Sequence, residues 1–333
     1  MTQTSFRAMV VEETADGRFE RRITDKAVSD LPKGDLLIKV HYSSLNYKDA
    51  LSANGNKGVT RRYPHTPGID AAGEVVHSDV SNFAQGARVL ITGYDLGMNT
   101  SGGFGQLVSV PAQWVVPLPE NLTLKQSMMF GTAGFTAAMS IFKLEENAVT
   151  PSSGKILVTG ATGGVGSMAT AILSHCGYDV VALTGKTDAH GYLTKLGAKE
   201  ILSREKVLSA PKKAILPSRY AAVIDTVGGE ILSYGIRTTQ YGGVVTCCGN
   251  AASGDLNITV YPFILRGIQL SGIDSAECPM DYRLKIWEKL AGPWRVPEME
   301  NFVTEIGLEE LPPRIDAMLA GGVTGRFVIN LNL

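Results

Sequence analysis

The stretch Val158-Thr159-Gly160-Ala161-Thr162-Gly163-Gly164-Val165-Gly166 follows a short apolar run and opens a segment of small, helix-forming residues. Glycines at such a turn let the backbone approach a pyrophosphate, which the unpaired N–H groups of the helix start can hold. The spacing departs from G-x-G-x-x-G, since Ala161 and Thr162 fill the first two places of the frame. A glycine-rich loop that only turns the chain is the alternative. The strand before it and the helix after it favour a nucleotide site.

Strands and helices alternate around and beyond this turn. Apolar runs rich in β-branched residues occupy residues 156–159, 180–183, 200–202, 222–225, 244–248 and 268–273, and helical segments occupy residues 165–175 and 192–196. Continuous apolar strands separated by helices are typical of a parallel sheet that is covered on both faces. The sequence therefore predicts a doubly wound α/β domain over residues 128–274.

The preceding part of the chain has a different texture. Short strand-like runs at residues 8–11, 36–40, 72–76, 88–91 and 106–110 are separated by Gly, Pro and Asp, which predicts a small β-barrel. A connecting helix is expected at residues 127–137. Helices at residues 282–290 and 311–319 and a strand at residues 326–329 are expected to return to the first domain. The predicted domains are thus 1–127 plus 275–333, and 128–274.

Composition excludes several classes of protein. The chain has 333 residues, of which 44% are hydrophobic, so it is long enough for two globular domains. Its 31 basic and 32 acidic residues leave a net charge of -1, so we expect no nucleic-acid or anionic-membrane partner. The four cysteines show no C-x-x-C spacing and are interpreted as buried thiols. No signal peptide and no membrane-length apolar run is apparent, which favours the cytoplasm.

The strand end Leu183-Thr184-Gly185-Lys186 decides between the two nicotinamide cofactors. An acidic residue here would bind the ribose 2′-OH of NAD, but none is present. Thr184 can donate a hydrogen bond and Lys186 carries a positive charge, while Arg204 follows the next strand. This pattern favours NADPH. Asp188 is an objection, and two ordinary surface cations are the alternative.

A metal centre is not expected. No Cys precedes Cys176, and His41, His65 and His77 have no partners at metal-binding spacing. The metal prediction is therefore none, and each histidine is interpreted as a surface residue or a satisfied core residue.

Polar side chains cluster at Ser43-Ser44-Leu45-Asn46-Tyr47-Lys48-Asp49, directly after a strand. Hydride transfer places negative charge on the acceptor, so its site needs a proton donor or an electrophile. Tyr47 is a candidate hydrogen-bond donor to an enolate, Asn46 a candidate for fixing the substrate carbonyl, and Asp49 a candidate for orienting Tyr47 or Lys48. A helix start, with Ser44 or Asn46 as N-cap and Asp49 in the first turn, explains the same residues.

The loop of residues 54–64 is locally basic. Arg61 and Arg62 are candidates for binding the phosphates of a large substrate. A solvated surface loop is the more common explanation of such a charge run.

Four ordered blocks resemble the medium-chain dehydrogenase/reductases, and more narrowly the zinc-independent branch of acryloyl-CoA reductases and quinone oxidoreductases. The blocks are Ser44-Leu45-Asn46-Tyr47-Lys48-Asp49-Ala50-Leu51, Pro67-Gly68-Ile69-Asp70-Ala71-Ala72-Gly73, Gly131-Thr132-Ala133-Gly134-Phe135-Thr136-Ala137 and the nucleotide turn. The resemblance covers nearly the whole chain. It implies a GroES-like β-barrel with an inserted Rossmann domain, an active site in the cleft, and a homodimer joined near residues 268–273.

The resemblance also implies site residues. Where zinc-dependent relatives place metal ligands, this chain has Asn46 and Gly68-Ile69-Asp70. Tyr47 is expected at the nicotinamide side of NADPH. The set expected to bind the rest of the cofactor is Thr162, Gly163, Gly164, Val165, Thr184, Gly185, Lys186, Arg204, Asn250 and Arg326.

The resulting hypothesis is NADPH-dependent reduction of an activated C=C bond, with acryloyl-CoA or a similar short 2-enoyl-CoA as substrate. Hydride would go to the β-carbon and a proton to the α-carbon, with Asn46, Tyr47 and water stabilising the enolate. An NADPH:quinone oxidoreductase is the alternative enzyme. An NADPH-binding sensor with vestigial activity is the alternative of another class.

Overall fold

The computed structural model describes residues 4–333. The chain forms two compact units, each with its own sheet and its own apolar core. Unit 1 comprises residues 4–132, 276–291 and 298–333, and unit 2 comprises residues 133–275 and 292–297. Compared with the predicted domain ranges, residues 128–132 fall in unit 1, whereas residue 275 and residues 292–297 fall in unit 2.

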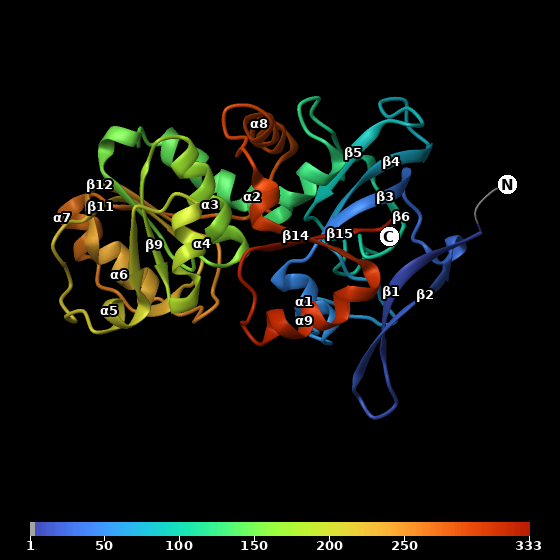
Figure 1. Cartoon of the computed structure of the whole chain (residues 1–333), viewed down its shortest axis with the longest axis horizontal. Coiled ribbons are helices and arrows are strands. Elements are labelled where there is room, and N and C mark those ends of the chain that lie inside the picture. Colours follow the sequence, from blue (N-terminus) through green and yellow to red (C-terminus); the bar gives the residue numbers. More distant parts are fainter. Residues whose placement is uncertain (1–3) are drawn as a thin grey trace. The chain divides into compact units, whose positions relative to one another are not determined.

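Unit 2 contains a parallel sheet of six strands in the order β10-β9-β8-β11-β12-β13 (Figure 1). Its strands are β8 (Lys155–Val158), β9 (Asp179–Thr184), β10 (Glu200–Ser203), β11 (Tyr220–Asp225), β12 (Thr239–Cys247) and β13 (Gln269–Gly272). Its helices include α3 (Gly164–His175), α4 (His190–Lys195), α5 (Arg204–Leu208), α6 (Gly229–Thr238) and α7 (Tyr261–Arg266). The predicted doubly wound sheet is confirmed.

The strand order reverses between β8 and β11, which are neighbours in the sheet although two strands separate them in the chain. Loops that leave the carboxyl ends of two such strands diverge, and the crevice between them is where α/β sheets bind ligands. The turn after β8 is the glycine-rich stretch that the sequence singled out. Its place in the topology supports a nucleotide-binding role.

Unit 1 contains a seven-stranded sheet in the order β14-β15-β3-β4-β5-β7, with β6 also paired to β3. Its strands are β3 (Leu36–Ser44), β4 (Asp70–Ser78), β5 (Arg88–Thr92), β6 (Leu107–Val110), β7 (Val116–Pro117), β14 (Val303–Gly307) and β15 (Arg326–Asn330). The first half of β3 pairs with β6 and its last residues pair with β15. The end of β3 therefore lies beside the start of β15.

A separate antiparallel hairpin, β1 (Ser5–Glu13) and β2 (Phe19–Ala27), projects from this unit (Figure 1). Charged residues interrupt the alternation of β2, and β14 is also short and half exposed, so the sequence did not predict either strand. The helices of this unit include α1 (Tyr47–Ala53), α8 (Met280–Ala291) and α9 (Leu311–Leu319), and α1 packs against α9.

The connecting helix is α2 (Leu124–Glu146), which is interrupted at Gly131 by backbone angles of φ 50° and ψ -158°. Its first turns belong to unit 1 and its last turns to unit 2, with the division after Thr132. The division therefore falls one residue after the kink, and unit 2 begins a few residues after the predicted position.

Two smaller expectations can be compared with the fold. Cys278 is buried as predicted, whereas Cys176, Cys247 and Cys248 are half-buried, so the interpretation as buried thiols is wrong for these three. Within residues 4–333, none of the helices is both long enough and apolar enough to span a bilayer.

Candidate active site

In unit 1, helix α1 begins directly after the end of β3, and its start is fixed by Asp49. The Asp49 carboxylate accepts hydrogen bonds from the backbone N–H of Asn46 at 2.8 Å and from the backbone N–H of Ile69 at 2.8 Å. The predicted helix start, with Asp49 in its first turn, is confirmed. Within residues 4–333 no hydrogen bond joins Asp49 to Tyr47 or Lys48, so Asp49 can orient them only through the start of α1. The carboxylate instead ties α1 to the segment that leads into β4.

Asp70 is the centre of a buried polar network in the same unit. Its carboxylate accepts hydrogen bonds from the Asn46 amide at 2.8 Å and from the Thr132 hydroxyl at 2.6 Å. It also accepts a bond from the Ser44 hydroxyl and one from the Thr132 backbone N–H at 2.9 Å. Four donors thus satisfy this fully buried carboxylate.

Arg326, at the start of β15, completes this network. Its guanidinium donates to the Asn46 amide oxygen at 3.0 Å, to the Ser44 hydroxyl at 2.8 Å and to the Met129 carbonyl at 3.3 Å. Arg326 is 3% exposed, so the charge is almost completely removed from water. Both ends of the Asn46 amide therefore have protein partners, which suits a positioning role better than direct contact with a substrate carbonyl.

Tyr47 is the most exposed polar side chain of the predicted cluster, and Lys48 is partly exposed. Tyr47 is 56% exposed, although it is the first residue of α1 and directly follows the buried Asn46. Its hydroxyl is consequently available to a ligand.

Burial also perturbs Asp49. Its side chain is fully buried, and this loss of hydration, together with the charge of Asp70, raises the pKa of Asp49 to about 7. Asp49 and Asp70 are thus two buried carboxylates that both bond to Asn46, and Asp49 changes charge near neutral pH.

Among residues 4–333, no three His, Cys, Asp or Glu side chains are grouped in a way that could hold a metal ion. His65 is buried and bonds through Nε2 to the Gly97 carbonyl at 2.9 Å, and burial lowers its pKa. His77 is exposed beside Asp79.

In unit 2, the turn after β8 has the form that a pyrophosphate requires. Gly160 has a φ of +57°, and a Cβ there would lie 2.3 Å from the Thr226 hydroxyl. A Cβ on Gly166 would lie 2.3 Å from the Gly160 carbonyl oxygen, so α3 packs directly on the turn. Gly163 is exposed just before α3 begins. The first N–H groups of α3 therefore face an open, glycine-lined approach.

The ends of β9 and β10 form a cationic pair beside this turn. The Arg204 guanidinium stacks on the backbone of Gly185, where a Cβ would lie 2.8 Å from its central carbon. Thr184 Oγ1 accepts the Lys186 N–H at 3.0 Å and lies 3.4 Å from Thr162 Oγ1. Partial burial lowers the pKa of Lys186. The residues fit a nucleotide that carries a 2′-phosphate, because two cations and no carboxylate occupy residues 184–186 and 204.

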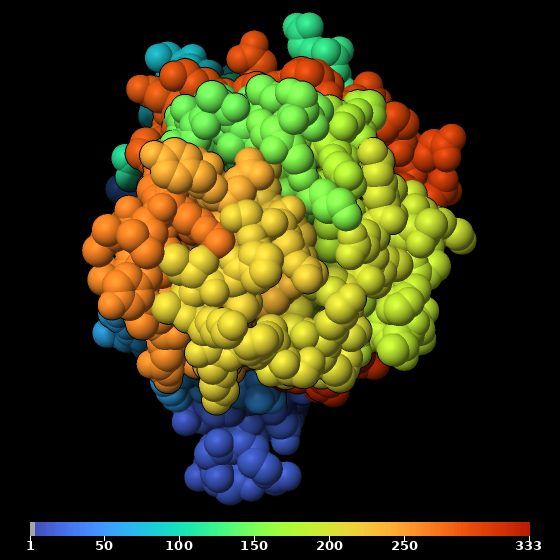
Figure 2. Space-filling view, turned by 90° about the vertical axis from the view of Figure 1, so that its left-hand side faces the viewer, coloured from blue at the N-terminus to red at the C-terminus, as the bar shows by residue number. Residues whose placement is uncertain are grey.

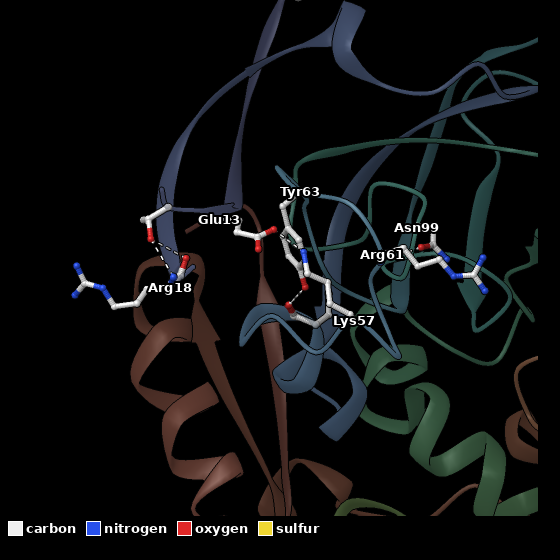
Figure 3. A network of polar contacts seen from close by, with 8 residues as sticks. Glu13, Arg18, Lys57, Arg61, Tyr63 and Asn99 are labelled. Carbon is white, nitrogen blue, oxygen red and sulfur yellow. Dashed lines mark hydrogen bonds and ion pairs between the residues drawn. The ribbon is translucent and has the colours of Figure 1, made fainter. Parts of the chain in front are cut away.

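The basic loop of unit 1 divides into two parts (Figure 3). Lys57 is ion-paired with Glu13 at 2.5 Å and lies over the rings of Phe19 and Tyr63, so it secures the hairpin to the loop. The Arg61 side chain points away from this group, and only its backbone N–H is bonded, to Asn99 at 3.2 Å. Within residues 4–333, neither Arg61 nor Arg62 uses its guanidinium in an ion pair or hydrogen bond.

Sequence reasoning did not assign a site role to Ser44, Asp70 or Thr132. All three lie within the sequence blocks that carry the family resemblance. The sequence could not show that their side chains meet, because that contact depends on how β3, β4 and α2 come together in the fold. Asn250 lies on the exposed loop that follows β12 in unit 2, whereas Arg326 lies in unit 1.

A GroES-like unit and a nucleotide-binding unit define a class of dehydrogenases and reductases, and the comparisons agree. The family described as alcohol dehydrogenase GroES-like domain matches residues 32–120, and the zinc-binding dehydrogenase family matches residues 164–291. The chain is 44% identical to the "Putative quinone oxidoreductase YhfP" of Bacillus subtilis (strain 168), over 98% of this chain and 99% of the relative. It is 40% identical to "Acrylyl-CoA reductase AcuI" of Ruegeria pomeroyi, over 98% and 99%.

Solved structures give the same result. The yhdH oxidoreductase of Salmonella enterica in complex with NADP superposes with a TM-score of 0.94 at 40% identity, covering 98% of this chain and 99% of that one. The yhfP protein of Bacillus subtilis with NAD bound gives 0.95 at 44% identity, covering 99% and 100%. The chain belongs to the medium-chain dehydrogenase/reductase family, in the zinc-independent acrylyl-CoA reductase and quinone oxidoreductase branch.

Proposed function

We propose that this protein is an NADPH-dependent reductase of activated C=C bonds, with acryloyl-CoA or a similar short 2-enoyl-CoA as its substrate. NADPH is the cofactor that the cationic pair at Lys186 and Arg204 fits, and the relative from Salmonella enterica was solved with NADP. The thioester follows the relative named as an acrylyl-CoA reductase. The observation that favours a CoA ester over a quinone is the pair of unengaged guanidinium groups at Arg61 and Arg62.

Tyr47, Asn46 and Asp49 have different roles in the proposed reaction. When bound, the cofactor supplies the hydride for the β-carbon of the substrate. The exposed hydroxyl of Tyr47 hydrogen-bonds the thioester oxygen, where negative charge develops, and passes a proton toward the α-carbon through water. Asn46 and Asp49 act as positioning residues, because they fix the start of α1 and thus the place of Tyr47.

The nucleotide would be held by residues of unit 2. Thr162, Gly163, Gly164 and Val165 present the start of α3 to the pyrophosphate, and Thr184, Gly185, Lys186 and Arg204 bind the 2′-phosphate. Asn250 lies on the loop after β12 at the same end of the sheet. We retain Arg326 as an expected cofactor contact, although its guanidinium donates to unit 1 groups.

The role of Arg61 and Arg62 is tested with two substrates. The R61A/R62A variant should raise KM for acryloyl-CoA about tenfold, since charge-assisted phosphate contacts are removed. KM for acryloyl-pantetheine, which lacks the nucleotide phosphates, should not change. Arg18→Ala is the matched control, because Arg18 is an exposed arginine of the same unit that pairs with Asp16. An equal effect on both thioesters would contradict phosphate binding.

Quinone reduction is the second candidate, because the relative from Bacillus subtilis carries that name. Steady-state rates with acryloyl-CoA and with a simple benzoquinone separate the two activities. A higher kcat/KM with the quinone would overturn the first proposal.

Tight NADPH binding without turnover of any electrophile would instead support a sensor. With turnover present, an unchanged kcat/KM in Tyr47→Phe would remove the proton-relay role.

We also propose a homodimer. In unit 2, β13 is an outer strand of the sheet, and α7 before it exposes Tyr261, Ile264 and Leu265. The residues of α7 and β13, orange in Figure 2, lie at the surface of the unit. An unpaired strand edge beside exposed apolar residues suits a second copy of the same edge.

A cytoplasmic location stays a prediction from the sequence.

A further inference from the structure

Three loops meet at the carboxyl end of the unit 2 sheet. They follow β8 at residues 159–163, β11 at residues 226–229 and β12 at residues 248–253. A Cβ on Gly249 would lie 2.4 Å from the Thr226 carbonyl oxygen, and one on Gly228 would lie 2.2 Å from the Ser253 carbonyl oxygen. The loops after β11 and β12 therefore touch backbone to backbone.

A single fully buried carboxylate, Asp225 at the end of β11, binds two of these loops directly. It accepts a hydrogen bond from the Thr159 hydroxyl at 2.7 Å. It also accepts bonds from the backbone N–H groups of Gly228 at 2.8 Å and Val227 at 3.2 Å. The backbone carbonyl of Asp225 accepts the N–H of Cys248 at 3.0 Å, which attaches the third loop.

Thr159 connects this carboxylate to the nucleotide turn. Its hydroxyl donates to Asp225 and accepts the Thr226 N–H at 3.0 Å, while its carbonyl accepts the Thr226 hydroxyl at 3.0 Å. Thr159 directly precedes Gly160, the residue with the positive φ that shapes the turn. The side chain of Asp225 thus acts on the turn through one intermediate residue.

We propose that Asp225 is a positioning residue for the cofactor, which fixes the phosphate-binding turn through Thr159 and ties it to the loop after β11 through the Gly228 N–H. This inference rests on the proposed function only in that NADPH is the ligand of the turn. Asp225 bonds directly to the pyrophosphate part of the site, whereas Thr184 and Arg204 have no bond to it among residues 4–333.

The experiment compares two ligands. NADPH engages both the turn and the cationic pair, whereas 2′-AMP carries only the phosphate that the cationic pair would bind. Asp225→Asn keeps the shape but replaces an acceptor oxygen by an NH₂ group, and Thr159→Val removes the bridging hydroxyl. Each should weaken NADPH binding about tenfold in calorimetry, because a buried donor or acceptor loses its partner. Binding of 2′-AMP, followed by phosphorus NMR, should stay unchanged.

Two control variants separate positioning from general destabilisation. Thr159→Ser keeps the hydroxyl and should restore NADPH binding. Thr239→Val removes a similarly buried hydroxyl at the opposite end of the sheet, where it donates to the Gly235 carbonyl at 2.8 Å, and should leave NADPH binding unchanged. If Asp225→Asn does not fold, Thr159→Val carries the test.

The outcomes are distinct. Normal NADPH binding by folded Asp225→Asn and Thr159→Val would overturn the inference. So would an equal loss of NADPH and 2′-AMP binding. A wild-type protein that does not bind NADPH would contradict the proposed function itself.

Discussion

Asp49 is the residue whose charge couples the site to pH. Burial and the charge of Asp70 raise its pKa from 3.8 to about 7. Between pH 3.8 and about pH 7, Asp49 is more protonated in the folded protein than in the unfolded chain. Protonated Asp49 therefore stabilises the fold fully below pH 3.8, and this stabilisation is lost as the pH rises through about 7.

Urea unfolding across that pH range tests the assignment. Between pH 4 and pH 7 the free energy of unfolding of the wild type should fall relative to Asp49→Asn by on the order of 4 kcal/mol, since the variant cannot ionise. Other carboxylates contribute equally to both proteins. Parallel curves would show that Asp49 is ionised throughout in the folded state.

Gly131 shows how closely the buried network approaches the backbone. Its φ is +50°, and a Cβ there would lie 2.5 Å from the Ser44 hydroxyl and 2.6 Å from both the Asp70 carboxylate and the Arg326 guanidinium. Gly131→Ala should lower the free energy of unfolding by about 3 kcal/mol or more, through backbone strain and displacement of buried polar groups.

Gly86→Ala is the matched control for this change. Gly86 also has a positive φ, of +83°, but nothing lies within 4 Å of the position of a Cβ. The Gly86→Ala variant should lose only about 1 kcal/mol of its free energy of unfolding, because only the backbone conformation is strained. An equal loss of unfolding free energy in Gly131→Ala and Gly86→Ala would show that the buried network accommodates the added methyl group without loss of stability.

At the scale of elements, the ends of β9 and β10 determine cofactor choice. Arg204→Ala should weaken NADPH binding about tenfold or more, because it removes a charge-assisted contact to the 2′-phosphate. Lys186→Ala should weaken it less, since an ammonium lacks the paired donors of a guanidinium. NADH lacks the phosphate and is the control ligand, so its fluorescence titration should not change. Equal weakening of both cofactors would contradict the assignment.

Helix α1 shows which parts of an element follow from local sequence. The Asn46 to Asp49 spacing predicts the helix start, because the contact between a first-turn carboxylate and the preceding N–H is local. The same spacing gives no information about Ile69 or Asp70, which reach α1 only through the folding of β4. The sequence therefore anticipated the helix that Asp49 begins, but not the bond from Ile69 to its carboxylate.

For the molecule as a whole, the proposed dimer can be tested at α7. Ile264 is 70% exposed, and Ile264→Glu would bury a charge in the proposed interface. The wild type should run as a dimer in size-exclusion chromatography with light scattering, and the variant as a monomer. Leu208→Glu is the control, because Leu208 is 55% exposed on α5 beside the opposite edge of the sheet and should leave the dimer intact. A monomeric wild type would contradict the proposal.

The sequence by itself determined the features that depend on neighbouring residues. Strand and helix periodicity, the glycines of the turn after β8 and the absence of an acidic residue at Thr184-Gly185-Lys186 are all properties of short segments. The parallel sheet and its nucleotide turn followed, because the alternation of apolar strands and helices permits few other arrangements.

Only the tertiary structure decided which polar groups share a site. Ser44, Asp70 and Arg326 come from three strands, and Asp225 meets Thr159 through the pairing of β8 with β11. A buried charge must find its donors wherever the fold brings them, and these partners lie far apart in the chain. Such contacts cannot be predicted from the spacing of residues along the sequence.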